Sequence, residues 1–155
     1  EYFSLTDPGR GIGYGLLIGL GVLAVSFLLD FLLGGAGFSL PVLDLTLFST
    51  VVVSPFAEEW ALRGFYMREQ MERGATLPSA GKNAAFVFVL MHLPGWYFQG
   101  RMREPLGLLQ PAFFVWWLGF ILAWSKNAGQ NNKSGSLYAP MIVHALNNLY
   151  VAARG

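Results

Sequence analysis

Five apolar stretches dominate this 155-residue chain and leave little room for a water-soluble fold. Short polar or Gly- and Pro-bearing segments separate them, and they span roughly 12–33, 42–62, 84–98, 111–125 and 137–153. A helix needs about 20 apolar residues to cross the hydrocarbon core of a bilayer. The first two stretches approach that length, so the third and fourth must be extended by their flanks, tilted, or partly re-entrant. We expect one all-α domain over residues 1–155, a polytopic transmembrane helical bundle of about five or more helices, which upstream segments could precede.

The composition supports this expectation and removes several function classes. The chain is 54% hydrophobic and only 12% charged, which is well below the charged fraction usual for soluble domains. Its net charge of +1 provides no basic surface of the kind that nucleic-acid-binding proteins carry. It contains no cysteine, which excludes disulfides, Cys-ligated zinc, iron–sulfur clusters and a thiol nucleophile. Any catalysis therefore depends on other side chains.

The distribution of basic residues predicts an orientation. If successive stretches cross the membrane, six basic residues fall on one side: Arg10, Arg68, Arg73, Lys82, Lys126 and Lys133. Three fall on the other side: Arg101, Arg103 and Arg154. Because positively charged short loops tend to stay in the cytoplasm, we expect a cytoplasmic N-terminus and cytoplasmic loops near 68–82 and 126–136. The short loops favour an integral protein of a prokaryotic cell membrane.

Two carboxylates and a guanidinium lie within or at the edge of the second apolar stretch. Ionisable groups there are costly unless they are paired or face a polar cavity. Glu59 and Arg63 are four residues apart with the acid first, which is the favourable order for a helical ion pair. Glu58 points about 100° away around the helix and is left without that partner. Pro55, just upstream, removes one backbone hydrogen bond and is expected to kink the helix.

Both histidines of the chain also lie in apolar stretches. His92 directly precedes Leu93-Pro94-Gly95, which predicts a position near a helix end or break. His144 and Asn148 are four residues apart and share one helix face. Each polar cluster must avoid lipid, and the simplest common solution is that all three converge on a buried polar site. The alternative is that these groups only hold helices together through interhelical hydrogen bonds.

A converged carboxylate, two imidazoles and an amide suffice for hydrolysis. Glu58 could act as a general base while His92 helps to polarise a water molecule. His144 and Asn148 could donate hydrogen bonds to the oxyanion of a tetrahedral intermediate, each worth roughly 3–4 kcal/mol. Glu58, His92 and His144 could instead bind zinc with an open position for water, although the His-Glu-x-x-His motif is absent. A serine mechanism has less support, because no serine in the apolar stretches has a Gly-x-Ser-x-Gly signature.

Together the three clusters resemble the CAAX prenyl endopeptidase and bacteriocin-processing family, also called the CPBP or Abi family of intramembrane peptidases. The family pattern is Glu-Glu-x-x-x-Arg, then Phe-x-x-x-His, then His-x-x-x-Asn. The chain matches it, in order, at Glu58-Glu59…Arg63, at Phe88…His92 and at His144…Asn148. The match spans about residues 54–150 and implies an all-helical membrane fold with a glutamate-type mechanism that needs no cofactor.

The resemblance also implies roles and substrates. The first Glu and first His would activate water, the second His and the Asn would form the oxyanion site, and Glu59 and Arg63 would support the geometry. Family members act on prenylated C-terminal motifs, leader peptides or membrane-associated sorting tails, and some are linked to bacteriocin self-immunity. We therefore expect an intramembrane endopeptidase acting on a membrane-associated or lipidated protein or peptide. A non-proteolytic membrane partner or bacteriocin-immunity protein is the alternative.

A small-residue stripe marks the first apolar stretch. Gly11, Gly15 and Gly19 repeat every four residues, so they lie on one helix face. Such a stripe lets another helix approach closely, either within the chain or in an oligomer.

Overall fold

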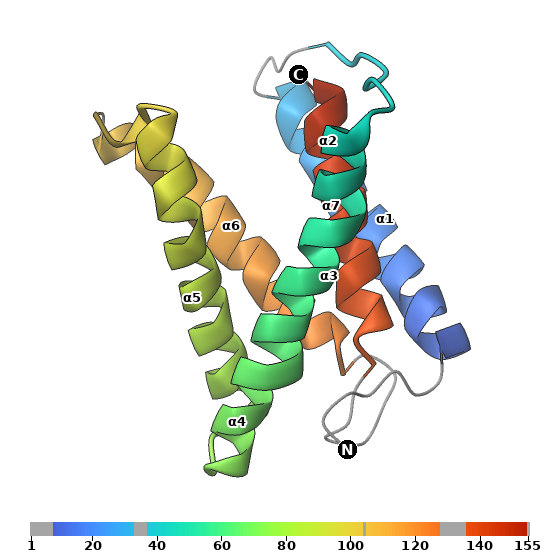
Figure 1. Ribbon diagram of the computed structural model, residues 1–155, viewed down its shortest axis with the longest axis vertical. Helices are drawn as coiled ribbons and strands as arrows, with labels where there is room; N and C mark the ends of the chain where they lie inside the picture. Colours follow the sequence, from blue (N-terminus) through green and yellow to red (C-terminus); the bar gives the residue numbers. More distant parts are fainter. Residues whose placement is uncertain (1–7, 33–36, 104, 128–135, 155) are drawn as a thin grey trace.

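The computed structural model describes residues 8–32, 37–103, 105–127 and 136–154, and the regular structure of these residues is helical throughout (Figure 1). The first long helix is α1 (Pro8–Leu32). The second is one continuous helix, here called the 45–72 helix, made of α2 (Leu45–Phe48), the π-helical turn η1 (Ser49–Val53), α3 (Ser54–Glu59), the π-helical turn η2 (Trp60–Tyr66) and α4 (Met67–Glu72). The remaining segments are α5 (Leu77–Phe98), the short 3-10 turn η3 (Arg101–Arg103), α6 (Pro105–Ser125) and α7 (Tyr138–Arg154). The predicted all-α bundle of five long helices is confirmed.

Each long helix covers most of one predicted apolar stretch, and several helices extend beyond their stretch. The third and fourth stretches gain their length from their N-terminal flanks, because α5 begins at Leu77 and α6 begins at Pro105. The charged segment that begins at Arg68, expected in a cytoplasmic loop near 68–82, instead forms the last turn of the 45–72 helix, which ends at Glu72. That helix ends where Gly74 adopts a positive φ of 95°, a conformation that favours glycine.

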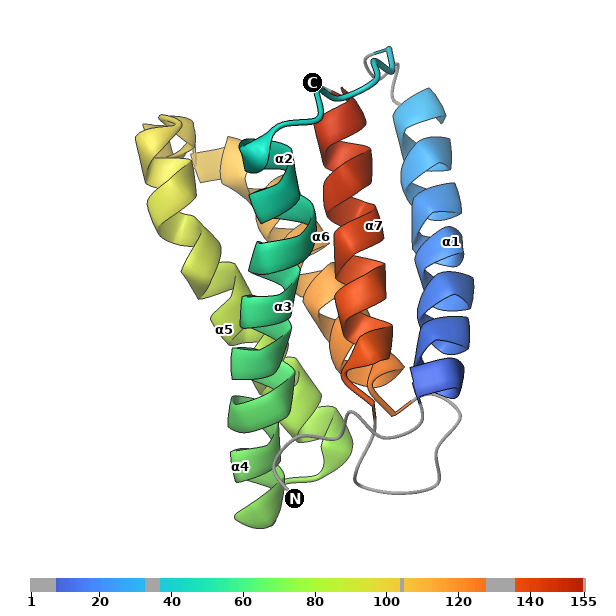
Figure 2. The same cartoon turned by 45° about the vertical axis from the view of Figure 1, so that its right-hand side comes forward.

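Consecutive long helices run in opposite directions (Figures 1 and 2). The starts of α1, α5 and α7 therefore lie at the same end of the bundle as the ends of the 45–72 helix and α6. This is the up-and-down arrangement on which the predicted distribution of basic residues depends. Lys126 was expected in a cytoplasmic loop near 126–136, but its side chain is buried and only 6% exposed. The loop around residues 128–135, with Lys133, lies outside the described residues.

The glycine stripe packs α1 against α7, which lie side by side in both views (Figures 1 and 2). A Cβ added at Gly15 would lie 3.0 Å from the backbone of Ala139, and one at Gly19 would lie 2.6 Å from Leu146. Close approach of the two backbones therefore requires glycine on α1. The glycine face of α1 is therefore used for packing within the chain. An oligomer contact through this face stays a prediction.

The 45–72 helix lies between α7 and α5 (Figure 2). Small side chains allow α5 and α6 to approach closely behind it, and the buried ones are Ala80, Gly81, Ala84, Ala85, Gly119 and Ala123. A larger apolar cluster fills the centre of the bundle: Val22, Leu62, Phe88, Leu118, Leu122 and Val143. The polar clusters of the 45–72 helix, α5 and α7 are thereby brought to one region.

The outer surface is strongly apolar. Leu17, Phe31 and Phe113 are 68%, 76% and 67% exposed. Among the described residues, Pro8–Leu32 and Leu108–Ser125 are long and apolar enough to cross a bilayer, with mean hydropathies of 2.3 and 1.5. Water does not favour such a surface, whereas lipid does.

The two predicted helix irregularities have different outcomes. The 45–72 helix continues through Pro55 and contains the π-helical turn η1 just upstream of it, and the expected kink stays a prediction. Pro94 lies inside α5, which continues to Phe98, so the predicted helix end or break beside His92 is wrong. One missing hydrogen bond costs less than ending a helix where the freed backbone groups would face apolar surroundings.

Candidate active site

The predicted ion pair between Glu59 and Arg63 is confirmed, and both side chains are fully buried. Arg63 Nη1 lies 3.0 Å from Glu59 Oε1, and Arg63 Nη2 donates to the Gly119 carbonyl of α6 at 2.7 Å. The guanidinium also lies over the Phe88 ring, 5.0 Å from its centroid. These contacts connect the 45–72 helix to α5 and α6. A buried charge pair of this kind is destabilising to break, because either partner alone would be left uncompensated.

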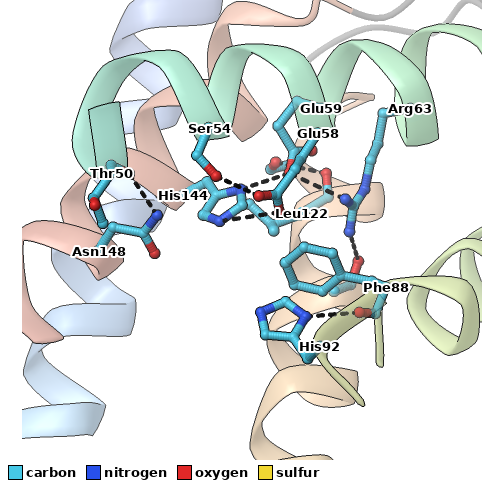
Figure 3. A network of polar contacts seen from close by, with 12 residues as sticks. Thr50, Ser54, Glu58, Glu59, Arg63, Phe88, His92, Leu122, His144 and Asn148 are labelled. Atoms are coloured by element: carbon cyan, nitrogen blue, oxygen red, sulfur yellow. Dashed lines mark hydrogen bonds and ion pairs between the residues drawn. The ribbon is translucent and has the colours of Figure 1, made fainter. Parts of the chain in front are cut away.

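His144 contacts both carboxylates, one through each ring nitrogen (Figure 3). Its Nδ1 is 2.8 Å from Glu59 Oε1, and its Nε2 is 3.9 Å from Glu58 Oε2. A carboxylate only accepts hydrogen bonds, so Nδ1 carries the hydrogen in this contact. Glu59 therefore fixes both the orientation of the ring and the direction of Nε2, which faces Glu58.

Glu58 occupies a different environment from Glu59, as its position around the helix predicted. Its side chain is 23% exposed and forms no ion pair with Arg63 among the described residues. The Ser54 hydroxyl donates a hydrogen bond to Glu58 Oε1, while Oε2 is the oxygen nearest His144. Sequence reasoning set Ser54 aside because it lacked a nucleophile signature. Its spacing of four residues from Glu58 was the available signal.

Asn148 lies one turn beyond His144 on α7, on the same side, as predicted. Its Nδ2 donates to the Thr50 carbonyl of η1 at 2.8 Å. The carboxamide is thus held by the backbone of the 45–72 helix rather than by Glu58 or His144 (Figure 3). Asn148 is thus connected to the helix that carries Glu58, through a backbone carbonyl that the sequence did not indicate as its partner.

His92 projects from the C-terminal third of α5, beside the other groups but without a direct bond to them (Figure 3). Its Nδ1 lies 2.8 Å from the Phe88 carbonyl, so Nδ1 carries the hydrogen and Nε2 is left as an acceptor in the neutral ring. The Phe88 ring lies edge-on to both histidines, with centroids 4.7 Å from His92 and 5.4 Å from His144. No hydrogen bond or ion pair joins His92 to Glu58 within the described residues.

Comparison of the chain with models of protein families shows to which family it belongs. The family model described as Type II CAAX prenyl endopeptidase Rce1-like matches residues 41–150. The chain belongs to this Rce1-like family. Neither a curated protein nor a solved structure matches the chain. The match includes every residue of the candidate site, while α1 lies before it.

Membership of the Rce1-like family confirms the resemblance found in the three motifs. At this general level the chain is a CAAX-type protease and a membrane protein. The roles of individual residues, the glutamate-type mechanism and the substrate are finer than the family match. They stay predictions, as do the orientation and the prokaryotic membrane.

The alternative zinc site has no geometric support in this Rce1-like chain. Among the described residues, no group of three or more His, Asp or Glu side chains is arranged to hold a metal ion. The set proposed from the sequence was Glu58, His92 and His144, and Phe88 lies between the two histidines of that set.

Lys126 is a further residue near the site that sequence reasoning placed elsewhere. Its Nζ donates to the Arg63 carbonyl at 2.7 Å, just beyond the end of α6. Burial, together with the nearby positive charge of Arg68, lowers the pKa of Lys126 to about 8. Lys126 therefore helps to hold the turn that carries Arg63, and no sequence pattern distinguished it from a loop lysine.

Proposed function

We propose that this protein is an intramembrane glutamate-type endopeptidase that hydrolyses a peptide bond in a membrane-associated or lipidated protein, or in a leader or sorting peptide. The observation that carries the proposal is the pair formed by Glu58 and His144, whose Oε2 and Nε2 atoms are 3.9 Å apart. That separation is too long for a direct hydrogen bond and suits a water molecule that bridges the two groups.

Glu58 is the carboxylate suited to activating water. Glu59 already accepts hydrogen bonds from Arg63 and His144. Glu58 is partly exposed, and Ser54 donates a hydrogen bond to only one of its oxygens. A general base needs a lone pair within hydrogen-bond reach of the attacking water. Glu58 Oε2 meets that need, so we assign it the proton of the water as the nucleophile adds to the scissile carbonyl.

His144 and Asn148 are proposed to stabilise the oxyanion of the tetrahedral intermediate. With Nδ1 donating to Glu59, Nε2 of His144 faces Glu58, and it can donate to an oxyanion when the ring carries a hydrogen on both nitrogens. Asn148 uses one Nδ2 hydrogen on the Thr50 carbonyl and has a second hydrogen available. Two preorganised donors of this kind supply a large share of the barrier reduction in acyl transfer.

His92 is proposed to assist Glu58 from α5. Its Nδ1 is occupied by the Phe88 carbonyl, which leaves Nε2 free to accept a hydrogen bond from the same water. Without a direct bond to Glu58, its contribution depends on substrate or water between α5 and the 45–72 helix. We therefore expect substitution of His92 to lower kcat less than substitution of Glu58 does.

The test is cleavage of peptide panels by the purified chain in lipid nanodiscs. Prenylated CAAX-type peptides are compared with the same peptides lacking the lipid and with leader-type peptides. Glu58→Gln is expected to lower kcat by at least about 100-fold while the fold is retained, because it removes the base without changing the shape. The matched control is Glu72→Gln, an exposed carboxylate on the same helix. Full activity of Glu58→Gln would overturn the assignment.

The same preparations separate the alternatives. Stoichiometric zinc in the wild type, with activity lost to chelators, would replace the glutamate mechanism by a metallopeptidase. If no peptide is cleaved and Glu58→Gln lowers thermal stability, the cluster serves only to hold helices together. The non-proteolytic or immunity role would then take the place of the peptidase.

A further inference from the structure

The backbone of η1 has an unusual hydrogen-bonding pattern beside the candidate site. In this π-helical turn the Ser54 N–H donates to the Ser49 carbonyl, five residues back, instead of to the Thr50 carbonyl, four residues back. In the same pattern the next donor along the chain would be residue 55, and it would serve the Thr50 carbonyl. Residue 55 is proline, which has no N–H.

The Thr50 carbonyl is consequently left without a donor from its own helix. An unpaired backbone carbonyl is costly away from water. Asn148 of α7 supplies the missing donor, because its Nδ2 lies 2.8 Å from the Thr50 oxygen. The proline and the π-helical turn act together here, since in a regular α-helix Ser54 would serve Thr50 and the proline would leave Val51 unserved instead.

We propose that Pro55 is a positioning residue for Asn148: by withholding an N–H from the Thr50 carbonyl, it creates the acceptor that orients the Asn148 carboxamide. The inference extends the proposed function, because Asn148 is useful as an oxyanion donor only when its second Nδ2 hydrogen points in a fixed direction. A carboxamide free to rotate would lose that preorganisation.

The hydrogen bond can be measured without activity. Thr50-Val51 is the only Thr-Val pair in the sequence. A protein labelled with 13C-carbonyl threonine and 15N valine therefore gives a single carbonyl–amide correlation, which reports on the Thr50 carbonyl. Asn148→Ala is expected to shift this carbonyl signal toward its position without a hydrogen bond. Adding Pro55→Ala to Asn148→Ala is expected to restore the signal, because residue 55 regains its N–H.

Pro111→Ala is the matched control, since Pro111 lies inside α6 rather than in the 45–72 helix. It is expected to leave the Thr50 signal unchanged. A Thr50 signal that does not respond to Asn148→Ala overturns the proposal, and this result needs only the single variant if Pro55→Ala does not fold. A response to Asn148→Ala that Pro55→Ala leaves unaltered also overturns it.

Activity measurements then test whether the orientation of Asn148 by Pro55 contributes to catalysis. Pro55→Ala is expected to lower kcat roughly 10-fold to 100-fold with little change in KM, and to cause no further loss in the Asn148→Ala background. A purely structural role of Pro55 would lower activity equally in both backgrounds and would overturn the positioning role. If the carbonyl shifts occur as expected but Asn148→Ala is fully active, the proposed oxyanion role fails while the backbone contact stands.

Discussion

His144 Nδ1 and Glu59 Oε1 are 2.8 Å apart, although 85 residues separate them in the chain. The same Glu59 oxygen also accepts from Arg63, so one buried carboxylate joins α7 to the 45–72 helix and fixes the histidine ring. Glu58, its neighbour in sequence, is left to face Nε2 of that ring. Adjacent glutamates thereby have different surroundings: Glu59 is held by Arg63 and His144, and Glu58 is the carboxylate proposed to act as the general base.

Glu59→Gln is expected to destabilise the protein strongly. The amide keeps the shape but removes the charge, so Arg63 is left buried without a counter-ion, a loss of about 3–5 kcal/mol. Thermal unfolding in nanodiscs measures the effect. Glu72→Gln breaks only the exposed pair with Arg68 and is expected to cost about 0.5 kcal/mol or less. Equal melting temperatures for Glu59→Gln and the wild type would contradict the structural role of Glu59.

Ser54→Ala is expected to lower kcat roughly 10-fold to 100-fold and to leave KM nearly unchanged. The hydroxyl donates to Glu58 Oε1, and a hydrogen bond to a charged group contributes roughly 1.5–3 kcal/mol. Without it the carboxylate is free to leave the side of His144. Ser54→Thr retains the hydroxyl and should recover most of the rate. If alanine and threonine behave alike, the hydroxyl does not position Glu58.

The sequence predicted the parts of the fold that depend on local composition and spacing. The five helices follow from apolar length, and the Glu59–Arg63 pair follows from a spacing of four with the acid first. The separate environment of Glu58 follows from its angle around the same helix. Each of these depends only on helix geometry, and each is confirmed.

The missed features depend on backbone groups and on neighbouring helices. The partner of Asn148 is a carbonyl freed by a π-helical turn, which side-chain patterns do not encode. Pro94 was expected to end α5, yet the helix continues because apolar surroundings offer the backbone no better partner. Lys126 resembled a loop lysine and is buried on the Arg63 carbonyl, a contact that exists only after α6 packs against the 45–72 helix.

Gly15→Ala is expected to lower stability by about 1–3 kcal/mol, because the new methyl group would meet the Ala139 backbone at 3.0 Å. Backbone atoms cannot rotate away, so α1 and α7 would have to separate. Gly13 provides the control, since it lies in the same helix and a Cβ there meets nothing within 4 Å. Gly13→Ala should be neutral or stabilising by up to about 1 kcal/mol. Similar losses for the two variants would mean that helix packing is not what the stripe provides.

Stability is expected to rise with pH between about 8 and 10.5 through Lys126. Its pKa is lowered from 10.5 to about 8 in the folded protein, so over this range the unfolded chain binds a proton that the folded chain does not. Proton uptake by the unfolded state weakens as pH rises, which favours folding. The melting temperature across this range measures the effect.

Lys126→Met should remove the Lys126 part of that rise, because the methionine does not titrate and fits an apolar site. It should also lower stability at high pH, since the Arg63 carbonyl loses its donor. Lys82→Met, at an exposed position of α5, should leave the pH profile unchanged. If the pH profile of stability is the same in the wild type and in Lys126→Met, then burial does not lower the pKa of Lys126 in the folded protein. The contact that positions the Arg63 turn would then have to be assigned to other groups.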